Sequence, residues 1–302
     1  MRRRFPYALG GLGTLGLDLP LDQRWDDSGS LVLDSELLTG ATPILGAPVL
    51  ELEITCEKPT AILAARLSDV SPTGEVTRVT YGLLNLSHRD SHEDLQPTEP
   101  GKSHRIRLAL NEVGYTFPPG HRIRLSLSTA YWPIAIPAPE RAKLTIQAEA
   151  SRLDLPIRAR QPGDDELPAF DAPEGSPRMP TTVLKSGNVE RSIRIDPAPP
   201  SRVTVTVKRD NGSVRLDPIG TVLGLKRQTT YSVAQNDPTT ARTEISQRYE
   251  LGRGTWQTAV QARTVLTCTQ STFQLQIDFD AFEGEKRVFC KSWSQEIARD
   301  LV

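Results

Sequence analysis

Residues 119–127 read PGHRIRLSL and carry the pattern that decides the fold. Ile123, Leu125 and Leu127 alternate with polar residues directly after a proline–glycine pair. Successive side chains of a strand point to opposite faces of its sheet, so this run buries one apolar face and leaves the other in water. Half-buried strands of this kind are typical of antiparallel sheets.

The same alternation recurs on both sides of that stretch, in residues 50–54, 106–110 and 144–148. Between two of the apolar runs, residues 71–74 read SPTG, a sequence that favours a tight turn. Several short strands at such spacing predict an all-β fold, a jelly-roll sandwich over residues 34–152. Residues 1–33 are then a lead-in segment.

A proline-rich stretch follows the predicted sandwich. Nine prolines lie within residues 153–200, together with an acidic patch at 164–166. Proline lacks the N–H that a sheet ladder needs, so the stretch is predicted to be an extended connector rather than sheet interior.

Alternation returns after the connector, beginning with residues 203–207. The Asp-Asn-Gly sequence at 210–212 predicts a hairpin turn, because Asn and Gly tolerate the positive φ of a tight hairpin. A short helix is expected after Ser294. Residues 201–302 are therefore predicted to form a second antiparallel β region, a meander. Its further strands are expected at 240–250, 255–264, 271–279 and 285–293.

Composition excludes some partners. The 302 residues contain 36 Lys+Arg against 37 Asp+Glu, a formal net charge of -1. A dedicated nucleic-acid-binding protein needs a basic excess, so no nucleic-acid partner is predicted. No apolar run approaches the roughly 18 residues of a membrane-spanning helix, so no membrane partner is predicted either.

The cysteines and the N-terminus bear on the compartment. Cys56, Cys268 and Cys290 are too few for a disulfide framework, and free thiols are favoured over a Cys268–Cys290 bridge. This usage favours a reducing, cytoplasmic location. Residues 1–5 read MRRRF and precede a Gly/Leu-rich stretch that loosely imitates a signal peptide, so secretion is the alternative.

Motifs for catalysis or cofactor binding are missing. There is no Gly-x-Ser-x-Gly nucleophile elbow, and the glycines at 10–13 precede no Lys-Ser or Lys-Thr of a phosphate loop. His88 and His92 lie in a polar loop, where residues four apart are not expected to converge on a metal. His121 is predicted to bond a backbone carbonyl. No catalytic residue, metal ligand or cofactor is therefore predicted.

Tyr131 and Trp132 follow the 121–128 strand and offer the remaining binding chemistry. Such a pair could stack on a sugar ring, although aromatics at strand ends more often pack against the core or a neighbouring domain. A stand-alone carbohydrate- or small-ligand-binding module is therefore one alternative function.

Several motifs occur together in a fixed order. They are DQR at 22–24, DD at 26–27, ARLSDV at 65–70, PTG at 72–74 and PGHRIRL at 119–125. As a set they resemble the C-terminal β-sandwich of the CocE/NonD hydrolases, the domain at the end of X-prolyl dipeptidyl peptidases, over about residues 20–150. Residues 200–302 resemble the extra β region of longer members.

The resemblance implies a galactose-binding-like jelly roll attached to an α/β-hydrolase core with a Ser-His-Asp triad. Such enzymes cleave acyl esters, amides or X-Pro peptides through an acyl-enzyme. In that family the triad comes from the core, which lies before the Asp-Gln-Arg segment, so no catalytic residue is carried over to this sequence. The segment just before Asp-Gln-Arg runs near the acyl pocket, which makes Leu15 and Leu17 candidate pocket-lining residues.

Function follows from this resemblance. The chain is predicted to be the non-catalytic part of such a serine hydrolase, inactive alone, which packs on an α/β-hydrolase core and shapes its cleft. The partner core is expected either in a longer protein or on a separate chain, and a homo-oligomer is left open. A third reading, a hydrolase with unrecognised catalytic residues, predicts slow ester turnover that serine-directed inhibitors do not block.

Overall fold

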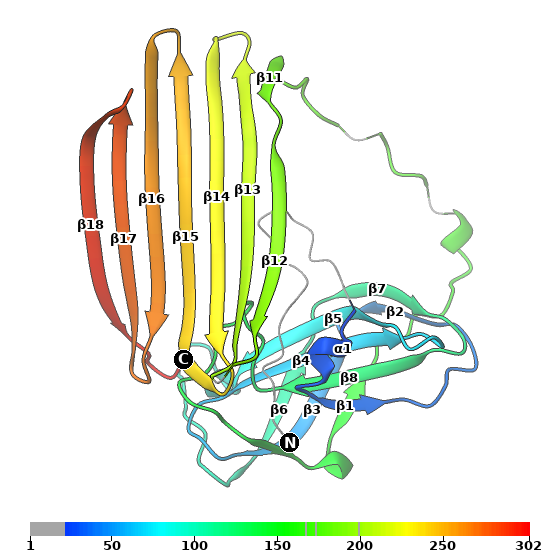
Figure 1. Cartoon of the computed structure of the whole chain (residues 1–302). Coiled ribbons are helices and arrows are strands. Elements are labelled where there is room, and N and C mark those ends of the chain that lie inside the picture. Colours follow the sequence, from blue (N-terminus) through cyan, green and yellow to red (C-terminus); the bar gives the residue numbers. More distant parts are fainter. Residues whose placement is uncertain (1–21, 167, 173, 199) are drawn as a thin grey trace. The chain divides into compact units, whose positions relative to one another are not determined.

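The computed structural model describes residues 22–166, 168–172, 174–198 and 200–302, which fall into two compact units (Figure 1). The first comprises the chain up to Leu167 together with Asp300–Val302, and we call it the sandwich unit. The second, Pro168–Arg299, we call the long-sheet unit. The strands in both pair antiparallel, which confirms the predicted all-β class; the jelly-roll topology stays a prediction.

Two sheets make up most of the sandwich unit. One has the strand order β1-β8-β4-β5, and the other has the order β10-β3-β6 with β9 also paired to β3. β2 and β7 form a separate pair. The bounds are β1 Leu31–Asp34, β2 Thr42–Gly46, β3 Val49–Cys56, β4 Ile62–Val70, β5 Val76–Asn85, β6 Ser103–Ala109, β7 Val113–Phe117, β8 Arg122–Ser128, β9 Leu144–Ile146 and β10 Arg152–Asp154.

A single hydrophobic core joins the two main sheets. It contains the alternating apolar residues of β3 and β6 from one sheet and those of β4 and β8 from the other. The alternation read from the sequence therefore predicts the inward faces correctly. Short helical pieces lie between strands: α1 Arg24–Asp27, η1 Leu86–His88, η2 Ala148–Ala150 and η3 Asp164–Glu166.

The turn predicted at residues 71–74 is confirmed. The Gly74 N–H donates to the Ser71 carbonyl at 2.9 Å, and Gly74 has φ +85°, a conformation that favours glycine. This turn links β4 to β5, whose pairing begins at Val70 and Val76.

The long-sheet unit is one sheet with the order β11-β13-β14-β15-β16-β17-β18, and β12 also pairs with β13. From β13 onward each strand pairs with the next along the chain, so the predicted meander is confirmed. The bounds are β11 Thr181–Lys185, β12 Asn188–Asp196, β13 Arg202–Leu216, β14 Thr221–Ala234, β15 Asp237–Arg253, β16 Trp256–Cys268, β17 Thr272–Glu283 and β18 Lys286–Ala298.

Three local predictions in this unit are wrong. Residues 210–212 form no hairpin: β13 continues through them with a register shift, and Gly212 uses its φ of +70° there. The segment after Ser294 is not helical, because β18 stays paired to β17 as far as Ala298. The predicted connector contains β11 and β12, since residues 181–196 are free of proline and pair with β13.

Residues 300–302 return to the sandwich unit. The Leu301 carbonyl accepts hydrogen bonds from Asn85 Nδ2 at 2.8 Å and from Ser87 Oγ at 3.0 Å. The long-sheet unit is therefore inserted between two stretches of the sandwich unit.

The cysteines are free, as favoured from the sequence. Cys268 ends β16 and Cys290 lies on β18, with β17 between the two strands. In the part of the chain that the structure describes, no helix is long and apolar enough to cross a membrane.

Candidate functional site

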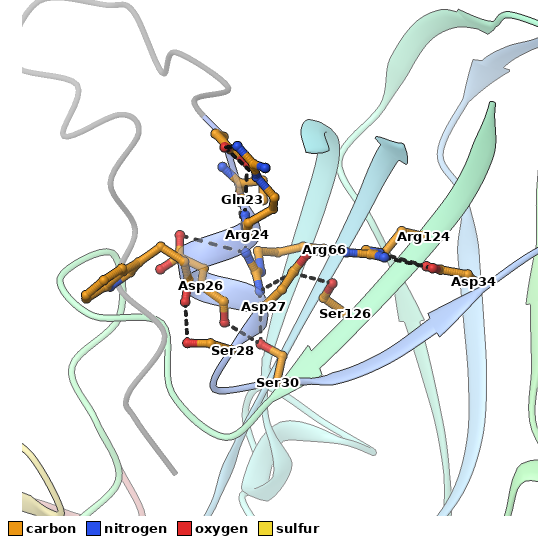
Figure 2. Close-up of polar contacts among 12 residues, drawn as sticks. Gln23, Arg24, Asp26, Asp27, Ser28, Ser30, Asp34, Arg66, Arg124 and Ser126 are labelled. Atoms are coloured by element: carbon orange, nitrogen blue, oxygen red, sulfur yellow. Dashed lines mark hydrogen bonds and ion pairs between the residues drawn. The ribbon is translucent and has the colours of Figure 1, made fainter. Parts of the chain in front are cut away.

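Polar residues from the recognised motifs meet on the outer face of the β1-β8-β4-β5 sheet, at α1 (Figure 2). Arg66 of β4 is at their centre and is fully buried. Its Nη1 donates to Gln23 Oε1 at 3.0 Å, and its Nη2 donates to Asp27 Oδ1 at 3.0 Å and to Ser30 Oγ at 2.9 Å. One guanidinium thus ties the whole lead-in turn to the middle of the sheet.

The carboxylate of Asp27 extends this network to β8. Ser126 Oγ donates to Asp27 Oδ1 at 2.7 Å, and Arg124 Nη1 donates to Asp27 Oδ2 at 3.0 Å. Arg124 also makes a two-pronged pair with Asp34, whose oxygens lie 2.7 Å from Nε and from Nη2. This pairing holds the pKa of the Asp34 carboxyl below its ordinary value and raises the pKa of Arg124.

We call these residues the Arg66 cluster. A buried charge is costly unless it is paired and hydrogen-bonded, so the cluster is stable only while the lead-in turn covers the sheet. What the arrangement does is hold residues 23–30 at a defined place on the sandwich unit. Its members are Gln23, Asp27, Ser30, Asp34, Arg66, Arg124 and Ser126.

A second polar cluster lies at the C-terminal end of β4. Asp69 accepts from Tyr115 Oη at 2.7 Å and lies 2.8 Å from His121 Nδ1. The partner of His121 is thus a carboxylate and not the predicted carbonyl. Burial, with Asp69 as a further cause, raises the pKa of Tyr115. Asp69 of β4 thus connects to β7 through Tyr115 and to the residue before β8 through His121.

Tyr131 and Trp132 lie inside the sandwich unit, 1% and 3% exposed. Tyr131 Oη accepts from Arg78 Nη1 at 2.7 Å, its ring lies 5.6 Å from that of Tyr81, and burial raises its pKa. Neither ring offers a face to solvent on which a sugar could stack. Leu15 and Leu17, the predicted pocket-lining residues, lie outside the described residues.

His88 and His92 converge, contrary to the prediction from the sequence. Their Nδ1 atoms are 3.1 Å apart and their ring centroids 5.3 Å apart. η1 ends at His88, and the loop that follows it brings His92 back to His88. Among the described residues, no group of three or more His, Cys, Asp and Glu side chains is arranged to hold a metal.

The sequence identifies the motifs but does not show that their side chains contact one another. A signal was present: on β4 the outward positions read Ala64, Arg66 and Ser68, a charged residue flanked by small ones. Small neighbours leave room for another segment to lie over the strand and pair with the charge.

Fold and site together define an all-β accessory domain whose motif residues hold a segment of chain in place. The family described as the X-Pro dipeptidyl-peptidase C-terminal non-catalytic domain matches residues 7–186. The chain belongs to this family, and the resemblance seen in the motifs is confirmed. A domain of this kind is the C-terminal part of a larger hydrolase with an N-terminal catalytic domain.

Curated relatives cover part of the chain. A "Putative serine esterase" of Mycobacterium tuberculosis is 29% identical over 158 residues, 45% of this chain and 25% of that protein. The cocaine esterase of Rhodococcus sp. is 25% identical over 116 residues, 38% of this chain and 20% of the esterase. The matches thus span about a quarter of the length of these relatives or less.

Solved structures show weaker similarity. An α-amino acid ester hydrolase has a TM-score of 0.45 and 22% identity, covering 47% of this chain and 28% of that one. A CocE/NonD family hydrolase from Staphylococcus aureus has a TM-score of 0.37 and 15% identity, covering 43% of this chain and 30% of the hydrolase.

Proposed function

We propose that the sandwich unit packs on the α/β-hydrolase core of a CocE/NonD-type serine hydrolase and closes one side of its substrate cleft. The reaction of the assembled enzyme is hydrolysis of an acyl ester, amide or X-Pro peptide bond. The names of the relatives, a serine esterase and a cocaine esterase, support the ester as substrate class. The sandwich unit contributes shape and position, and the core contributes the nucleophile.

The Arg66 cluster is the observation that carries this proposal. It fixes residues 23–30 against β4 and β8, so the chain that precedes residue 22 starts from a defined point on the sandwich unit. A domain that shapes a neighbour's cleft has to hold its connecting segment in one geometry, because the barrier depends steeply on substrate positioning.

An apolar edge beside the cluster supports the same proposal. Leu31 and Leu33 of β1 pair with the buried Leu127 and Leu125 of β8, yet they are 49% and 46% exposed. Leu37 follows on the same edge and is also exposed. Contiguous exposed apolar residues mark interaction surfaces, so this edge is where we place the contact with the core.

The test is immunoprecipitation from source cells with an antibody raised against this chain, followed by labelling with a fluorophosphonate that reacts with active-site serines. We expect one labelled polypeptide in the precipitate. A labelled band much larger than 33.3 kDa places the core in the same protein, and a separate labelled band places it on a partner chain. A precipitate without a labelled serine hydrolase overturns the proposal.

The cytoplasmic location and the homo-oligomer are two further proposals, and each has its own measurement. Fractionation of source cells tests the cytoplasmic location, which three free cysteines support. Light scattering on the purified chain tests the homo-oligomer.

A further inference from the structure

β18 is the last strand in the order of the long sheet, and it pairs there with β17 (Figure 1). Every residue of its span, Lys286–Ala298, is exposed. A strand at the edge of a sheet presents a row of backbone N–H and C=O groups that can pair with a further strand. β18 is therefore an accessible template for strand addition.

One irregularity sets the usable part of this edge. The register between β17 and β18 shifts between Ala281 and Phe282, and the pairing skips Val288. From Phe289 to Ala298 the pairing with β17 then continues without interruption. A bulge bends and twists its strand, so a further strand adds most readily along the regular stretch.

The regular stretch of β18 carries few of the residues that protect sheet edges. Charged side chains, especially lysine, and proline are the usual means of protection. Residues 289–297 read FCKSWSQEI, in which Lys291 and Glu296 are the charged residues and proline is absent. The opposite edge of the sheet contains β12, which reads NVERSIRID and has four charged residues among its nine. β18 is thus the less protected of these two strands.

We propose that β18 pairs antiparallel with β18 of a second copy of this chain, with Trp293 on the two-fold axis. The long sheets of the two copies then join edge to edge into one sheet. A two-fold contact of this kind is isologous, so every off-axis contact occurs twice and assembly stops at the dimer. The register places Phe289 opposite Ile297 of the second copy, Cys290 opposite Glu296, Lys291 opposite Gln295 and Ser292 opposite Ser294.

The side chains of β18 are complementary to themselves in this register. Phe289, Trp293 and Ile297 lie on one face of the sheet and are 50%, 43% and 42% exposed. In the dimer Trp293 meets its own copy and Phe289 meets Ile297, which are aromatic and aromatic–β-branched cross-strand pairs of the favourable kind. No two like charges stand opposite each other in residues 289–297.

Other registers lose this complementarity. With Lys291 on the axis, two ammonium groups would face each other, and like charges directly opposite are destabilising. With Ser292 on the axis, Phe289 would meet Gln295. With Ser294 on the axis, Trp293 would meet Gln295. Trp293 is the axis position at which all three exposed apolar side chains of the stretch have apolar partners.

The charges of β12 decide against a head-to-tail contact between β18 of one copy and β12 of the next. Such a contact leaves a free edge at each end and grows into an open filament. It would also set the exposed apolar residues of β18 against a strand in which Glu190, Arg191, Arg194 and Asp196 are charged. Pairing of two edges buries less surface than a face-to-face interface, so we expect a reversible dimer.

The first experiment is sedimentation velocity of the 302-residue chain over a range of micromolar concentrations. We expect a reversible equilibrium between monomer and dimer. A monomer at every concentration overturns the inference, and so does growth beyond the dimer. The inference rests on the homo-oligomer proposed above and is independent of the hydrolase core, which the labelling experiment tests separately.

Engineered cysteines test the register. One variant carries Lys291→Cys and another Gln295→Cys, both with Cys290→Ser to remove the exposed native thiol; Cys56 and Cys268 are buried. Directly opposite Cβ atoms lie about 4.5–5.5 Å apart, close to what a disulfide needs. The same position in the two copies is separated by four residues along the strands, about 14 Å.

We therefore expect a disulfide-linked dimer when the two cysteine variants are mixed under mild oxidation, and none from either variant alone. A dimer in solution without this cross-link would leave the homo-oligomer in place and overturn β18 as its surface. A cross-link formed by one variant alone would show a different register and would overturn the assignment of Trp293 to the axis.

A tryptophan pair supplies a matched control for the contact itself. Trp293→Lys places two ammonium groups on the two-fold axis, so we expect it to raise the dissociation constant of the dimer at least about tenfold. Trp256→Lys makes the same change at the first residue of β16, where the side chain is 51% exposed, and should leave the dissociation constant unchanged. Both variants should keep the circular dichroism of the unmodified chain. Equal effects of the two changes would overturn the inference.

Discussion

Two sheets of this chain share one sequence pattern and differ in what covers them. The middle strands of the β1-β8-β4-β5 sheet, β4 and β8, are largely buried on both faces: leucines face the core, and the lead-in turn covers the polar face through Arg66. The long sheet has equally regular alternation, yet large apolar side chains of its outer strands, such as Ile193 of β12 and Trp293 of β18, are 40% and 43% exposed. Alternation identifies an apolar face but does not say whether a second layer exists.

The largest expected effect comes from removing the buried charge. Arg66→Met leaves Asp27 in the interior with fewer partners, so we expect a loss of about 3–5 kcal/mol in the free energy of unfolding. The matched change in the long sheet is Arg263→Met, which breaks an ion pair whose arginine is 43% exposed. It should cost about 1 kcal/mol or less, and urea unfolding of both variants makes the comparison. Similar costs would show that the two sheets are not covered differently.

The second-largest effect on the free energy of unfolding is expected for one of two leucines, a buried one in the sandwich unit and an exposed one in the long sheet. Leu67 of β4 is completely buried, and Leu251 of β15 is 41% exposed. Leu67→Ala should cost about 2–5 kcal/mol because it removes packed surface and leaves a cavity. Leu251→Ala should cost below about 1 kcal/mol in urea unfolding, as is usual for surface positions. A large cost at Leu251 would mean that its face is covered in solution.

Two glycines, Gly212 and Gly220, test whether β13 makes a close backbone contact at its register shift. Gly212 and Gly220 both have left-handed φ, +70° and +63°, but a Cβ at Gly212 would lie 2.0 Å from the Lys185 carbonyl oxygen, whereas Gly220 has open space around it. Gly220→Ala should cost about 1 kcal/mol, from backbone strain alone. Gly212→Ala should cost about 2–3 kcal/mol and raise hydrogen exchange in β11. Equal exchange in both variants would argue against a close contact at the register shift.

The smallest effect depends on pH. Pairing with Arg124 holds the folded-state pKa of Asp34 below its ordinary value of 3.8, so its contribution is fully present above that value and is lost as the pH falls through the folded-state pKa. Asp34→Asn should lower stability by about 1 kcal/mol at neutral pH. The difference from the unmodified chain should shrink as the pH falls below 3.8. A difference that is constant down to acid pH would rule out the ion pair as its cause.

The strands were largely predictable because alternation is a local property. Those of β3, β6, β8 and β16 were placed correctly, whereas β11 and β12 were missed because the prolines on either side of them dominated the interpretation. The Asp-Asn-Gly sequence of β13 is a case in which a local turn signal gave a wrong prediction. Its glycine does take a left-handed φ, but pairing on both sides of the strand turns a local turn signal into a register shift.

The site was less predictable than the fold. The motifs contained Arg66, Asp27 and Arg124, and Ser126 directly follows the last of them, but the bonds between these residues join positions 39, 97 and 99 apart. Such contacts are set by sheet register and by the path of the lead-in turn, which local sequence does not specify. The convergence of His88 and His92 was missed for a related reason, since local sequence does not specify the path of the loop that follows η1.

The return of residues 300–302 to Asn85 and Ser87 has a consequence for dissection of the molecule. The chain passes from the sandwich unit into the long-sheet unit and returns to the sandwich unit at residues 300–302. A protease that cuts once within residues 168–180 therefore produces a C-terminal piece that still carries part of the sandwich unit. Only non-covalent contacts of residues 300–302, among them the two hydrogen bonds to the Leu301 carbonyl, then connect the C-terminal piece to the sandwich unit. Limited proteolysis analysed on native and denaturing gels measures whether these contacts hold the two pieces together.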